Sequence, residues 1–389
     1  MNRDALQPAP LAGPRAVLTA DHEMFRDQVR RFFEKHVVPH HRQWERDGIV
    51  SREVWRQAGE AGILCPMMSE EYGGAGADFG YSAIVIEEIA RTNCTGPGFP
   101  LHSDIVVPYI EDLARPERKQ DWLPKMARGE IIGAIAMTEP GMGSDLKAVR
   151  TRARREGEHY VLNGQKTFIT NGQNAGLVIV VAKTDPAAGR KGVSLICVEE
   201  GTPGFTKGRN LEKIGLHAQD TSELFFDEVR APVANRLGEE GQGFRYLIHN
   251  LPQERLIIAL RSAASIEAML EETVAYAKQR QVFGQTVFDF QHNRFRLADA
   301  KAQAAMLRVF VDHCLALHLR GGLSVELAAT AKLMASEMQN RLLDDFLQVH
   351  GGYGYTSEYA IGRAWADARV ARIYGGSSEI MKEIIARTL

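Results

Sequence analysis

The stretch Tyr160-Val161-Leu162-Asn163-Gly164-Gln165-Lys166-Thr167-Phe168 is where the chain changes from helical to extended character. Its β-branched and aromatic residues favour strands, and Asn163-Gly164 is typical of a two-residue type I′ turn, which requires positive φ angles. We therefore expect two strands around a tight turn. Further candidate strands lie at 177–181, 192–198 and 223–226. Several short strands separated by Gly and Pro indicate a barrel or a sandwich.

Helical patterns precede this extended region. Thr19 and Asp21 are candidate N-caps of a first helix. The segments 51–62 and 80–92 predict further helices, and the glycine-rich stretch 72–76 between them predicts a loop.

Helical patterns also follow the extended region. The segments 243–281, 291–320 and 324–349 are long, rich in Ala, Leu, Met and Arg, and have apolar residues at helical spacing. Pro252 is a place where the first of them could kink or restart, and Gly321-Gly322 separates the other two.

Helices, then strands, then helices predict an α+β multidomain fold, because alternating βαβ units would interleave the two patterns. We assign residues 1–18 to a flexible leader, 19–130 to an N-terminal helical domain, 131–240 to a middle β-domain and 241–389 to a C-terminal helical domain. No GxGxxG motif follows a predicted strand, so a Rossmann nicotinamide site has little support.

The composition excludes several classes of protein. The 389 residues are 44% hydrophobic and 25% charged, with a formal net charge of -2, which is ordinary for a globular protein. Nucleic-acid binding and anionic membranes favour a strong basic excess, which is missing here. No apolar run reaches the ~18 residues that a membrane-spanning helix needs.

The four cysteines, Cys65, Cys94, Cys197 and Cys314, are far apart and form no CxxC pair. A zinc site or a disulfide framework is therefore not expected, and we assign no metal ligands. Free thiols fit a reducing compartment, and with no targeting segment in view we expect a cytoplasmic, bacterial-type location.

Five segments spread along the chain share one family pattern. They are Ala136-Met137-Thr138-Glu139-Pro140-Gly141-Met142-Gly143-Ser144-Asp145, Gly164-Gln165-Lys166-Thr167-Phe168-Ile169-Thr170-Asn171-Gly172, Gln279-Arg280-Gln281-Val282-Phe283-Gly284, Gln348-Val349-His350-Gly351-Gly352 and Ile373-Tyr374-Gly375-Gly376-Ser377-Ser378-Glu379-Ile380. In this order and spacing they make residues 20–389 resemble the acyl-CoA dehydrogenase family, closest to its long-chain type. The resemblance implies an N-terminal helical domain, a middle β-barrel-like domain and a C-terminal four-helix bundle domain. It also implies a homotetramer with FAD between the last two domains, in contact with a neighbouring subunit.

The reaction that the resemblance implies is α,β-dehydrogenation of an acyl-CoA thioester to the trans-2-enoyl-CoA, a step of fatty acid β-oxidation. A base removes the α-proton, the β-hydrogen leaves as hydride to the flavin, and the electrons pass to an electron-transferring flavoprotein. Charge on the thioester oxygen needs aimed donors, which in the family are a flavin hydroxyl and a backbone N–H near the C-terminal motif. We expect an acyl chain that is medium to long, or branched.

The position of the base distinguishes two branches of the family. Many members carry a Glu directly after the Tyr of the C-terminal motif, where this chain has Gly375. Long-chain and isovaleryl-CoA dehydrogenases instead place the base on a C-terminal helix. Residues 251–256, Leu-Pro-Gln-Glu-Arg-Leu, resemble that helix in the long-chain type, which assigns the base to Glu254.

The helix pattern supports Glu254 without the family. On a 3.6-residue period it shares a face with Asn250, Leu251, Ile257 and Ile258, the first two only if the helix runs through Pro252. A carboxylate on a mainly apolar face is partly desolvated, which raises its pKa toward the value that a general base needs. The plainer alternative is a surface Glu paired with an Arg such as Arg261.

Further positions match FAD contacts of the family. Small residues let backbone N–H groups approach a cofactor, an aromatic ring packs on the flavin, and an Arg binds a diphosphate bidentately. The set is Met137, Thr138, Gly143, Ser144, Phe168, Ile169, Thr170, Arg280, Phe283, Gln291, Gln348, Gly351, Gly352, Ser377 and Glu379. Taken singly, these residues also suit an ordinary glycine-rich turn, a strand core and a helix end. We interpret His350 as a structural group, and Glu379 not as the base.

A smaller set matches positions near the acyl-CoA: Ser144, Arg190, Lys191, Arg255, Gly375 and Gly376. Arg245 stands where the long-chain type has a Tyr lining the acyl channel, so the chain length stays open. Two rival functions remain at this stage. One is a flavin oxidase or monooxygenase of the same fold, and the other is a non-catalytic acyl-CoA- or flavin-binding scaffold.

Overall fold

The computed structural model describes residue 13 and residues 15–389, which form two compact units. The helical unit contains the described residues up to Asp27 together with Ile86–Asn93 and Arg255–Leu389. The sheet unit contains Gln28–Val85 and Cys94–Glu254. The predicted flexible leader, residues 1–18, lies largely outside the described residues.

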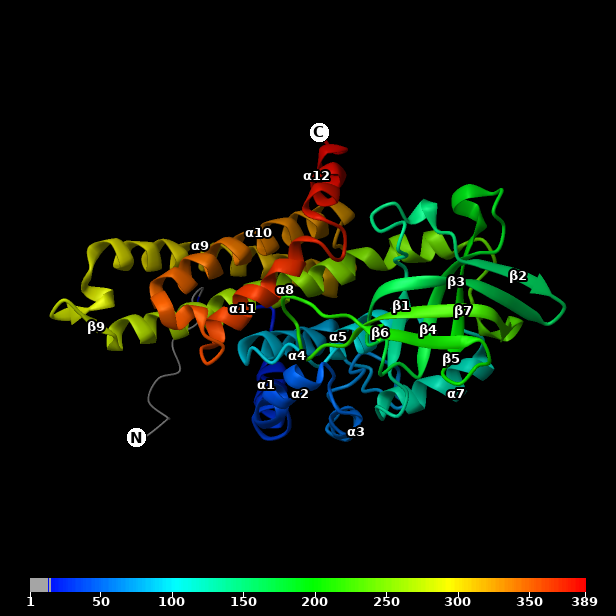
Figure 1. The fold of residues 1–389 in the computed structure, drawn as a ribbon, viewed down its shortest axis with the longest axis horizontal. Coiled ribbons are helices and arrows are strands. Elements are labelled where there is room, and N and C mark those ends of the chain that lie inside the picture. Colours follow the sequence, from blue (N-terminus) through cyan, green and yellow to red (C-terminus); the bar gives the residue numbers. More distant parts are fainter. Residues whose placement is uncertain (1–12, 14) are drawn as a thin grey trace. The chain divides into compact units, whose positions relative to one another are not determined.

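An eight-stranded sheet forms the centre of the sheet unit, as Figure 1 shows in green. Its strands are β1 (Gly133–Ala136), β2 (Arg152–Glu156), β3 (His159–Thr170), β4 (Leu177–Lys183), β5 (Val193–Glu199), β6 (Phe205–Asn210), β7 (Thr221–Pro232) and β8 (Arg236–Leu237). The strand order is β6-β7-β3-β2-β4-β5-β8, with β1 parallel to β4. The apolar run of β4 is buried along almost its whole length, because the strand is covered on both faces.

The predicted turn at Asn163-Gly164 is wrong. β3 runs unbroken through both residues, and its pairing with β7 shifts register there, so the pair forms a β-bulge. Gly164 has φ +152°, and a Cβ on it would lie 2.6 Å from Thr151 Oγ1, so a glycine is required by close packing. The turn between β2 and β3 lies earlier, at Gly157 with φ +55°.

Short helices complete the sheet unit. They are α2 (Val38–Asp47), α3 (Arg52–Glu60), α5 (Phe99–Leu101), α6 (Val107–Leu113) and α7 (Pro116–Ala127). A π-helical turn, η4 (His102–Val106), leads directly into α6. The helices α1 (Ala20–Phe32) and α4 (Phe79–Arg91) contribute residues to both units. The helices predicted at 51–62 and 80–92 are confirmed as α3 and α4.

Long helices form the helical unit. They are α8 (Gly243–Gln279, in this unit from Arg255 on), α9 (Gln291–Leu319), α10 (Val325–His350), α11 (Ala360–Ala368) and α12 (Ser378–Ala386). A hairpin of β9 (Gln281–Val282) and β10 (Gln285–Thr286) joins α8 to α9. Figure 1 shows α9 and α10 side by side. The predicted break at Gly321-Gly322 separates them, with Gly321 at φ +69°.

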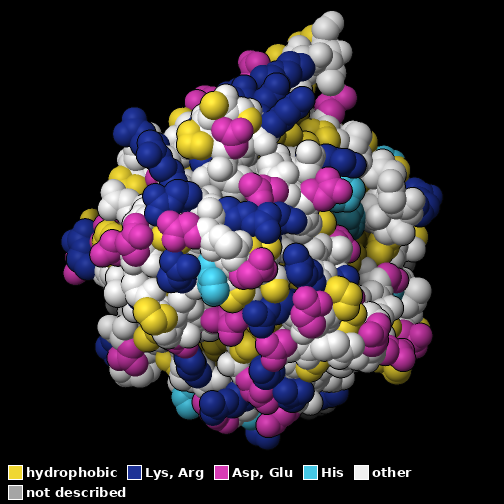
Figure 2. All heavy atoms as spheres, turned by 90° about the vertical axis from the view of Figure 1, so that its right-hand side faces the viewer, with side chains coloured by type: hydrophobic (Ala, Val, Ile, Leu, Met, Phe, Trp, Pro, Cys, Tyr) yellow, Lys and Arg dark blue, Asp and Glu magenta, His cyan; other side chains and the backbone are white. Residues whose placement is uncertain are grey.

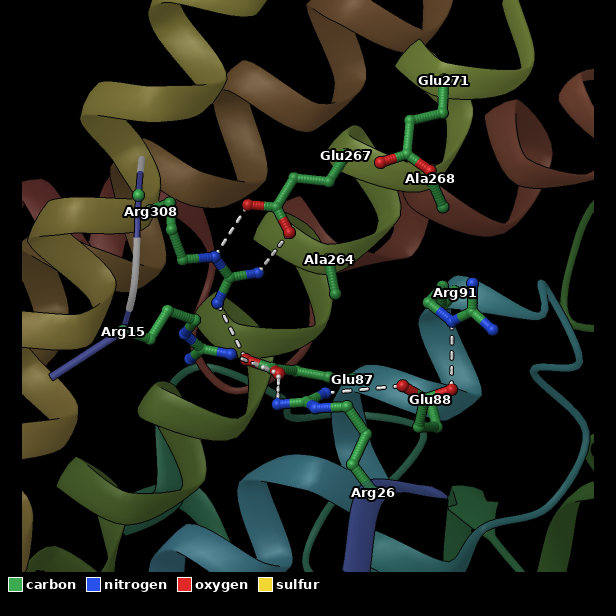
Figure 3. A pocket seen from close by; sticks show the side chains of 11 residues that line it. Arg15, Arg26, Glu87, Glu88, Arg91, Ala264, Glu267, Ala268, Glu271 and Arg308 are labelled. Carbon is green, nitrogen blue, oxygen red and sulfur yellow. Dashed lines mark hydrogen bonds and ion pairs between the residues drawn. The ribbon is translucent and has the colours of Figure 1, made fainter. Parts of the chain in front are cut away.

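A buried network of charges ties the elements of the helical unit together (Figure 3). Glu87 on α4 accepts ion pairs from Arg15 at 2.7 Å, Arg26 at 3.0 Å and Arg308 at 2.8 Å. Arg15, a residue of the predicted leader, also binds Asp312 of α9 through two of its nitrogens. Burial alone would raise the pKa of Glu87, but the three guanidinium groups outweigh it and hold that pKa far below its usual range.

The outer surface carries both signs of charge. On the face in Figure 2, Lys and Arg side chains are interspersed with Asp and Glu. None of the helices in the described part of the chain has the length and apolarity needed to cross a membrane.

We predict that Glu87→Gln destabilises the protein by about 3–5 kcal/mol, because it leaves buried guanidinium groups without their shared carboxylate. Urea unfolding followed by circular dichroism measures this free energy. The matched control is Glu383→Gln, which removes an exposed carboxylate from its pair with Arg387 and should change stability little. Equal effects of the two substitutions would contradict the structural role of Glu87.

Candidate active site

Helix α8 carries Glu254 and runs without interruption through Pro252. Asn250 and Leu251 therefore share the helix face of Glu254, which the sequence had predicted only if the helix continued through Pro252. Ile257 and Ile258 on this face are buried, and the Glu254 side chain is itself only 8% exposed. The burial of Glu254 rules out a surface pairing, and the predicted, mainly apolar helix face is confirmed.

Tyr109 on α6 contacts this carboxylate within the sheet unit. Its hydroxyl donates to Glu254 Oε1 at 3.2 Å, and the tyrosine is fully buried. Burial and the adjacent Glu254 carboxylate raise the pKa of Tyr109 well above its usual value, so the phenol stays protonated. The two residues are 145 positions apart, and no motif marks Tyr109, which is why the sequence did not reveal it.

The turn before α6 is also tied to α8 close to Glu254. The Gln253 side chain donates to the backbone oxygen of Asp104 in η4 at 2.6 Å. The Asp104 carboxyl accepts from Ser82 Oγ at 2.5 Å, and burial raises the pKa of Asp104 to about 7. The Gln253 contact holds the turn before α6, and hence Tyr109, close to the part of α8 that carries Glu254.

The turn at Gly375-Gly376 lies in the helical unit. Both residues have positive φ, +63° and +92°, and a Cβ on Gly375 would overlap the Cδ1 atom of Ile258. A side chain at position 375 would therefore strain the backbone and force the Ile258 side chain to shift. Ile258, whose side chain fills the space beside Gly375, lies in the part of α8 that belongs to the helical unit.

A buried lysine holds this turn. Lys332 on α10 donates to the backbone oxygen of Gly376 at 2.7 Å. Burial, with the nearby charge of Arg255, lowers the pKa of Lys332 to about 8. Burying an ammonium group is costly unless it is hydrogen-bonded, and this bond to Gly376 O holds the orientation of the Gly376-Ser377 peptide.

The first family segment forms a compact turn in the sheet unit. The backbones of Glu139 and Met142 bond to each other in both directions at 3.0 Å. The Glu139 carboxylate is buried and accepts from Lys166 Nζ at 2.8 Å and from Thr151 N–H at 3.0 Å. Burial would raise the pKa of Glu139, but Lys166 and the Thr151 donors lower it. The Glu139 contacts hold the foot of this turn in place. Gly143 faces open space, with nothing within 4 Å of a Cβ placed on it.

The second family segment is joined to the first. The Thr167 N–H donates to Thr138 O at 3.0 Å, which brings Met137, Thr138, Gly143 and Ser144 together with Phe168, Ile169 and Thr170. Phe168 has φ +60° and is 66% exposed, at a register shift in β3. A strained backbone that turns an aromatic ring outward is the reverse of a strand-core phenylalanine, so that alternative is excluded.

Two predicted contacts at the end of α8 are exposed. Phe283 is 96% exposed and, with Gly284, has positive φ in the β9–β10 turn. The Arg280 guanidinium lies 5.4 Å from the ring centre of Tyr353, which places it near Gly351 and Gly352. Both glycines have open space around them.

The remaining predicted cofactor residues lie at helix ends of the helical unit. Gln291 begins α9, and Gln348 is exposed near the end of α10. Ser377 is the N-cap of α12, where its hydroxyl accepts from Ile380 N–H, and Glu379 is exposed in the first turn. Backbone and Ser377 hydrogen bonds hold the pKa of Glu379 below its usual range, which suits an ionised group rather than a poised base.

His350 has the structural environment expected of it. Its ring stacks on Tyr276 with centroids 4.3 Å apart, and its Nδ1 bonds to Phe346 O at 2.8 Å. The Tyr276 hydroxyl donates to the His350 backbone oxygen at 3.1 Å.

The residues predicted to contact the acyl-CoA lie in both units. Arg190 and Lys191 lie in an exposed turn of the sheet unit, with the Arg190 guanidinium 5.8 Å from the ring centre of Phe244. Arg255 is buried in the helical unit. Within the described part of the chain, no group of three His, Cys, Asp or Glu side chains could hold a metal ion.

Three family models match consecutive parts of the chain. The acyl-CoA dehydrogenase N-terminal domain matches residues 19–130, the middle domain residues 134–229 and the C-terminal domain residues 241–389. The chain belongs to the acyl-CoA dehydrogenase family. It is an oxidoreductase acting on CH–CH bonds, and homotetramers are typical of the family.

Individual relatives cover nearly the whole chain. The long-chain specific acyl-CoA dehydrogenase of Sus scrofa mitochondria is 52% identical over 97% of this chain and 88% of its own length. The crystal structure of an acyl-CoA dehydrogenase from Geobacillus kaustophilus is 48% identical, with a TM-score of 0.95 over 96% of this chain and 99% of that one. A chain from the structure of the electron transferring flavoprotein of Acidaminococcus fermentans is 34% identical, with a TM-score of 0.90 over 95% and 98%.

Acyl-CoA dehydrogenases use FAD, and the residues present fit that cofactor. The sheet unit offers an exposed aromatic ring at Phe168 and the hydroxyls of Thr138, Ser144 and Thr170. The helical unit offers the Arg280 guanidinium beside open glycine backbone. Hydroxyl donors, an exposed flat ring and a bidentate cation suit a flavin with its diphosphate.

We predict that Gly375→Ala lowers stability by about 1–3 kcal/mol, since a Cβ both strains the positive φ and overlaps Ile258. Thermal unfolding of the purified protein measures the loss. Gly322→Ala is the control in the same unit, because a Cβ there meets only ordinary contacts at 3.7 Å. A Gly375→Ala protein as stable as the control would show that position 375 has room for a side chain.

Proposed function

We propose that Glu254 is the base of an FAD-dependent acyl-CoA dehydrogenase acting on long-chain substrates. The observation that supports this assignment most directly is the buried Glu254 carboxylate on a mainly apolar helix face. It gains weight because the alternative family position is Gly375, where a side chain would overlap Ile258. Partial burial keeps water from competing for the carboxylate and suits proton transfer from carbon.

The chemistry breaks two C–H bonds and forms one C=C bond. Glu254 takes the α-proton, the electrons of the Cα–H bond form the new double bond, and the β-hydrogen leaves with its electron pair. FAD, when bound, supplies the acceptor for that hydride. The carboxylate becomes a neutral carboxylic acid, which its apolar surroundings favour over the charged form.

The substrate oxygen needs a positioned donor while the α-proton leaves. We assign this role to a backbone N–H group of the turn at Gly375-Gly376, in which Lys332 holds the Gly376-Ser377 peptide through Gly376 O. A fixed peptide dipole costs no reorganisation during the reaction, which is why a buried lysine on that carbonyl is useful.

The cofactor-binding set proposed from the sequence is retained. Phe168 would pack along the flavin ring, with Thr170 and the backbone of Ile169 beside it, since the Ile169 side chain is buried in the sheet core. Thr138 and Ser144 would donate to the flavin. Arg280, Gln291, Gln348, Ser377 and Glu379 would serve the diphosphate and adenosine side. All lie at or near helix ends, and all but the half-buried Ser377 are exposed. Arg190 and Lys191 would lie toward the CoA phosphates.

Glu254→Gln tests the base. We expect loss of flavin bleaching by acyl-CoA, by a factor of about 10³ or more, because an amide cannot accept the proton. FAD content should be unchanged, measured from the absorbance of the purified variant. Full bleaching by Glu254→Gln would reject Glu254 as the base, and rapid oxygen consumption during turnover would favour the oxidase alternative.

The proposed substrates are long-chain acyl-CoA thioesters, since a long-chain specific dehydrogenase is 52% identical. Arg245 stands where the long-chain type has a Tyr lining the acyl channel, and it is exposed on α8. Medium-length and branched chains are therefore the alternative substrates. We expect kcat/KM to increase from short to long straight chains in a bleaching assay. A maximum at a short or a branched acyl-CoA would reject the long-chain proposal.

We propose an electron-transferring flavoprotein as the electron acceptor and the cytoplasm as the location. The relative in the Acidaminococcus fermentans structure supports the acceptor. The four cysteines are buried free thiols, which suits a reducing compartment. Reduction of a purified electron-transferring flavoprotein by enzyme and acyl-CoA tests the acceptor, and activity confined to exported or membrane fractions would contradict the location.

A further inference from the structure

We propose that Tyr109 is a positioning residue that orients the Glu254 carboxylate and sets the pH range in which it works. This inference rests on the proposed role of Glu254 as the base. Its starting point is the hydrogen bond from the Tyr109 hydroxyl to Glu254 Oε1 at 3.2 Å, with both side chains buried.

The direction of this hydrogen bond follows from chemistry. Burial and the Glu254 charge raise the pKa of Tyr109, so the phenol keeps its proton and donates it to the carboxylate. A hydrogen bond with the Asn250 side chain lowers the pKa of Tyr109, which is the effect of a donor on the phenolic oxygen. The order is therefore Asn250 to Tyr109 to Glu254.

The Tyr109 hydroxyl bridges two side chains that lie one helical turn apart on α8. Asn250 and Glu254 are four residues apart on α8, so their side chains lie on the same face, and the Tyr109 hydroxyl binds both. A carboxylate that is held at one oxygen loses rotational freedom, and its other lone pairs keep a defined direction. Such orientation is what proton abstraction from carbon requires.

The tyrosine itself is held firmly. It lies on α6 and has no exposed surface. The Gln253 side chain ties α8 to η4, the turn that precedes α6, at 2.6 Å. Tyr109 and Glu254 thus both lie on helices of the same unit, so regular structure holds each side of the contact.

The same bond affects proton affinity. A donor to the carboxylate favours its charged form, whereas the apolar face disfavours it. Removing the donor should therefore raise the pKa of Glu254 and move the acid limb of the kcat profile to higher pH. A base that is both misoriented and partly protonated near neutral pH transfers the proton more slowly.

The test is Tyr109→Phe in the FAD-loaded protein. Loss of a hydrogen bond to a charged group predicts a kcat lower by about 10- to 100-fold at pH 7, with KM changed by less than about 3-fold. The acid limb should shift upward by about one unit. The primary isotope effect on flavin reduction, with substrate deuterated at the α-carbon, should increase because proton abstraction becomes more limiting.

Tyr160→Phe is the matched control. Tyr160 is also fully buried in the sheet unit and donates to a glutamate, Glu240 Oε2 at 2.5 Å, but that carboxylate lies outside the site. It should leave the pH profile and isotope effect unchanged. Asn250→Ala removes the hydrogen bond between Asn250 and Tyr109 and leaves the Tyr109–Glu254 bond in place. It should shift the acid limb in the same direction by less. This variant keeps the proposal testable if Tyr109→Phe does not fold.

The Glu254→Gln background separates the two assignments. If the base is Glu254, Tyr109→Phe adds little to a protein that already lacks the carboxylate. A fully active Glu254→Gln protein would reject the base itself. An inactive Glu254→Gln protein together with a Tyr109→Phe protein of wild-type kcat, pH profile and isotope effect would reject the positioning role alone.

Discussion

The site depends on one constraint, the unbroken course of α8 through Pro252. A proline inside a helix removes one backbone donor, here the N–H that would reach the oxygen of Ile248. Ile248 is exposed, so water can bind that oxygen and the helix continues. Without this continuity, Asn250 and Glu254 would not share a face, and the carboxylate would not meet Tyr109. A local defect in hydrogen bonding is therefore tolerated where water can compensate for it.

Buried charges recur in both units, and each is balanced by specific partners. Glu139 with Lys166 secures a turn, Glu87 secures α4 against α9, and Lys332 fixes a peptide. Replacing such pairs by apolar residues would often stabilise a protein, so their presence is better explained by geometry than by stability. A charged pair tolerates few alternative arrangements, whereas an apolar contact tolerates many. The turns proposed to face the cofactor are the places where few arrangements are acceptable.

Much of the fold was predictable from local pattern. The helix positions followed from apolar spacing, and the family resemblance drew attention to the missing acid at Gly375 and to Glu254 as the alternative base. The turn at Asn163-Gly164 was not, because a β-bulge and a hairpin turn use the same residue types and differ only in what packs against them. Tyr109 and the outward ring of Phe168 depend on tertiary contacts and register. No local pattern encodes either, and the cofactor contacts themselves stay a prediction.

Arg15 has a consequence for where the protein can be cut. The N-terminal family model starts at residue 19, and the first helix starts at Ala20, so a shortened protein would naturally begin near there. Such a truncation would delete Arg15, one of the three guanidinium groups on Glu87, and would leave Asp312 without its bidentate partner. A stable shortened protein should therefore begin before the start of the N-terminal family model, so that it keeps Arg15, a residue that lies outside every regular element.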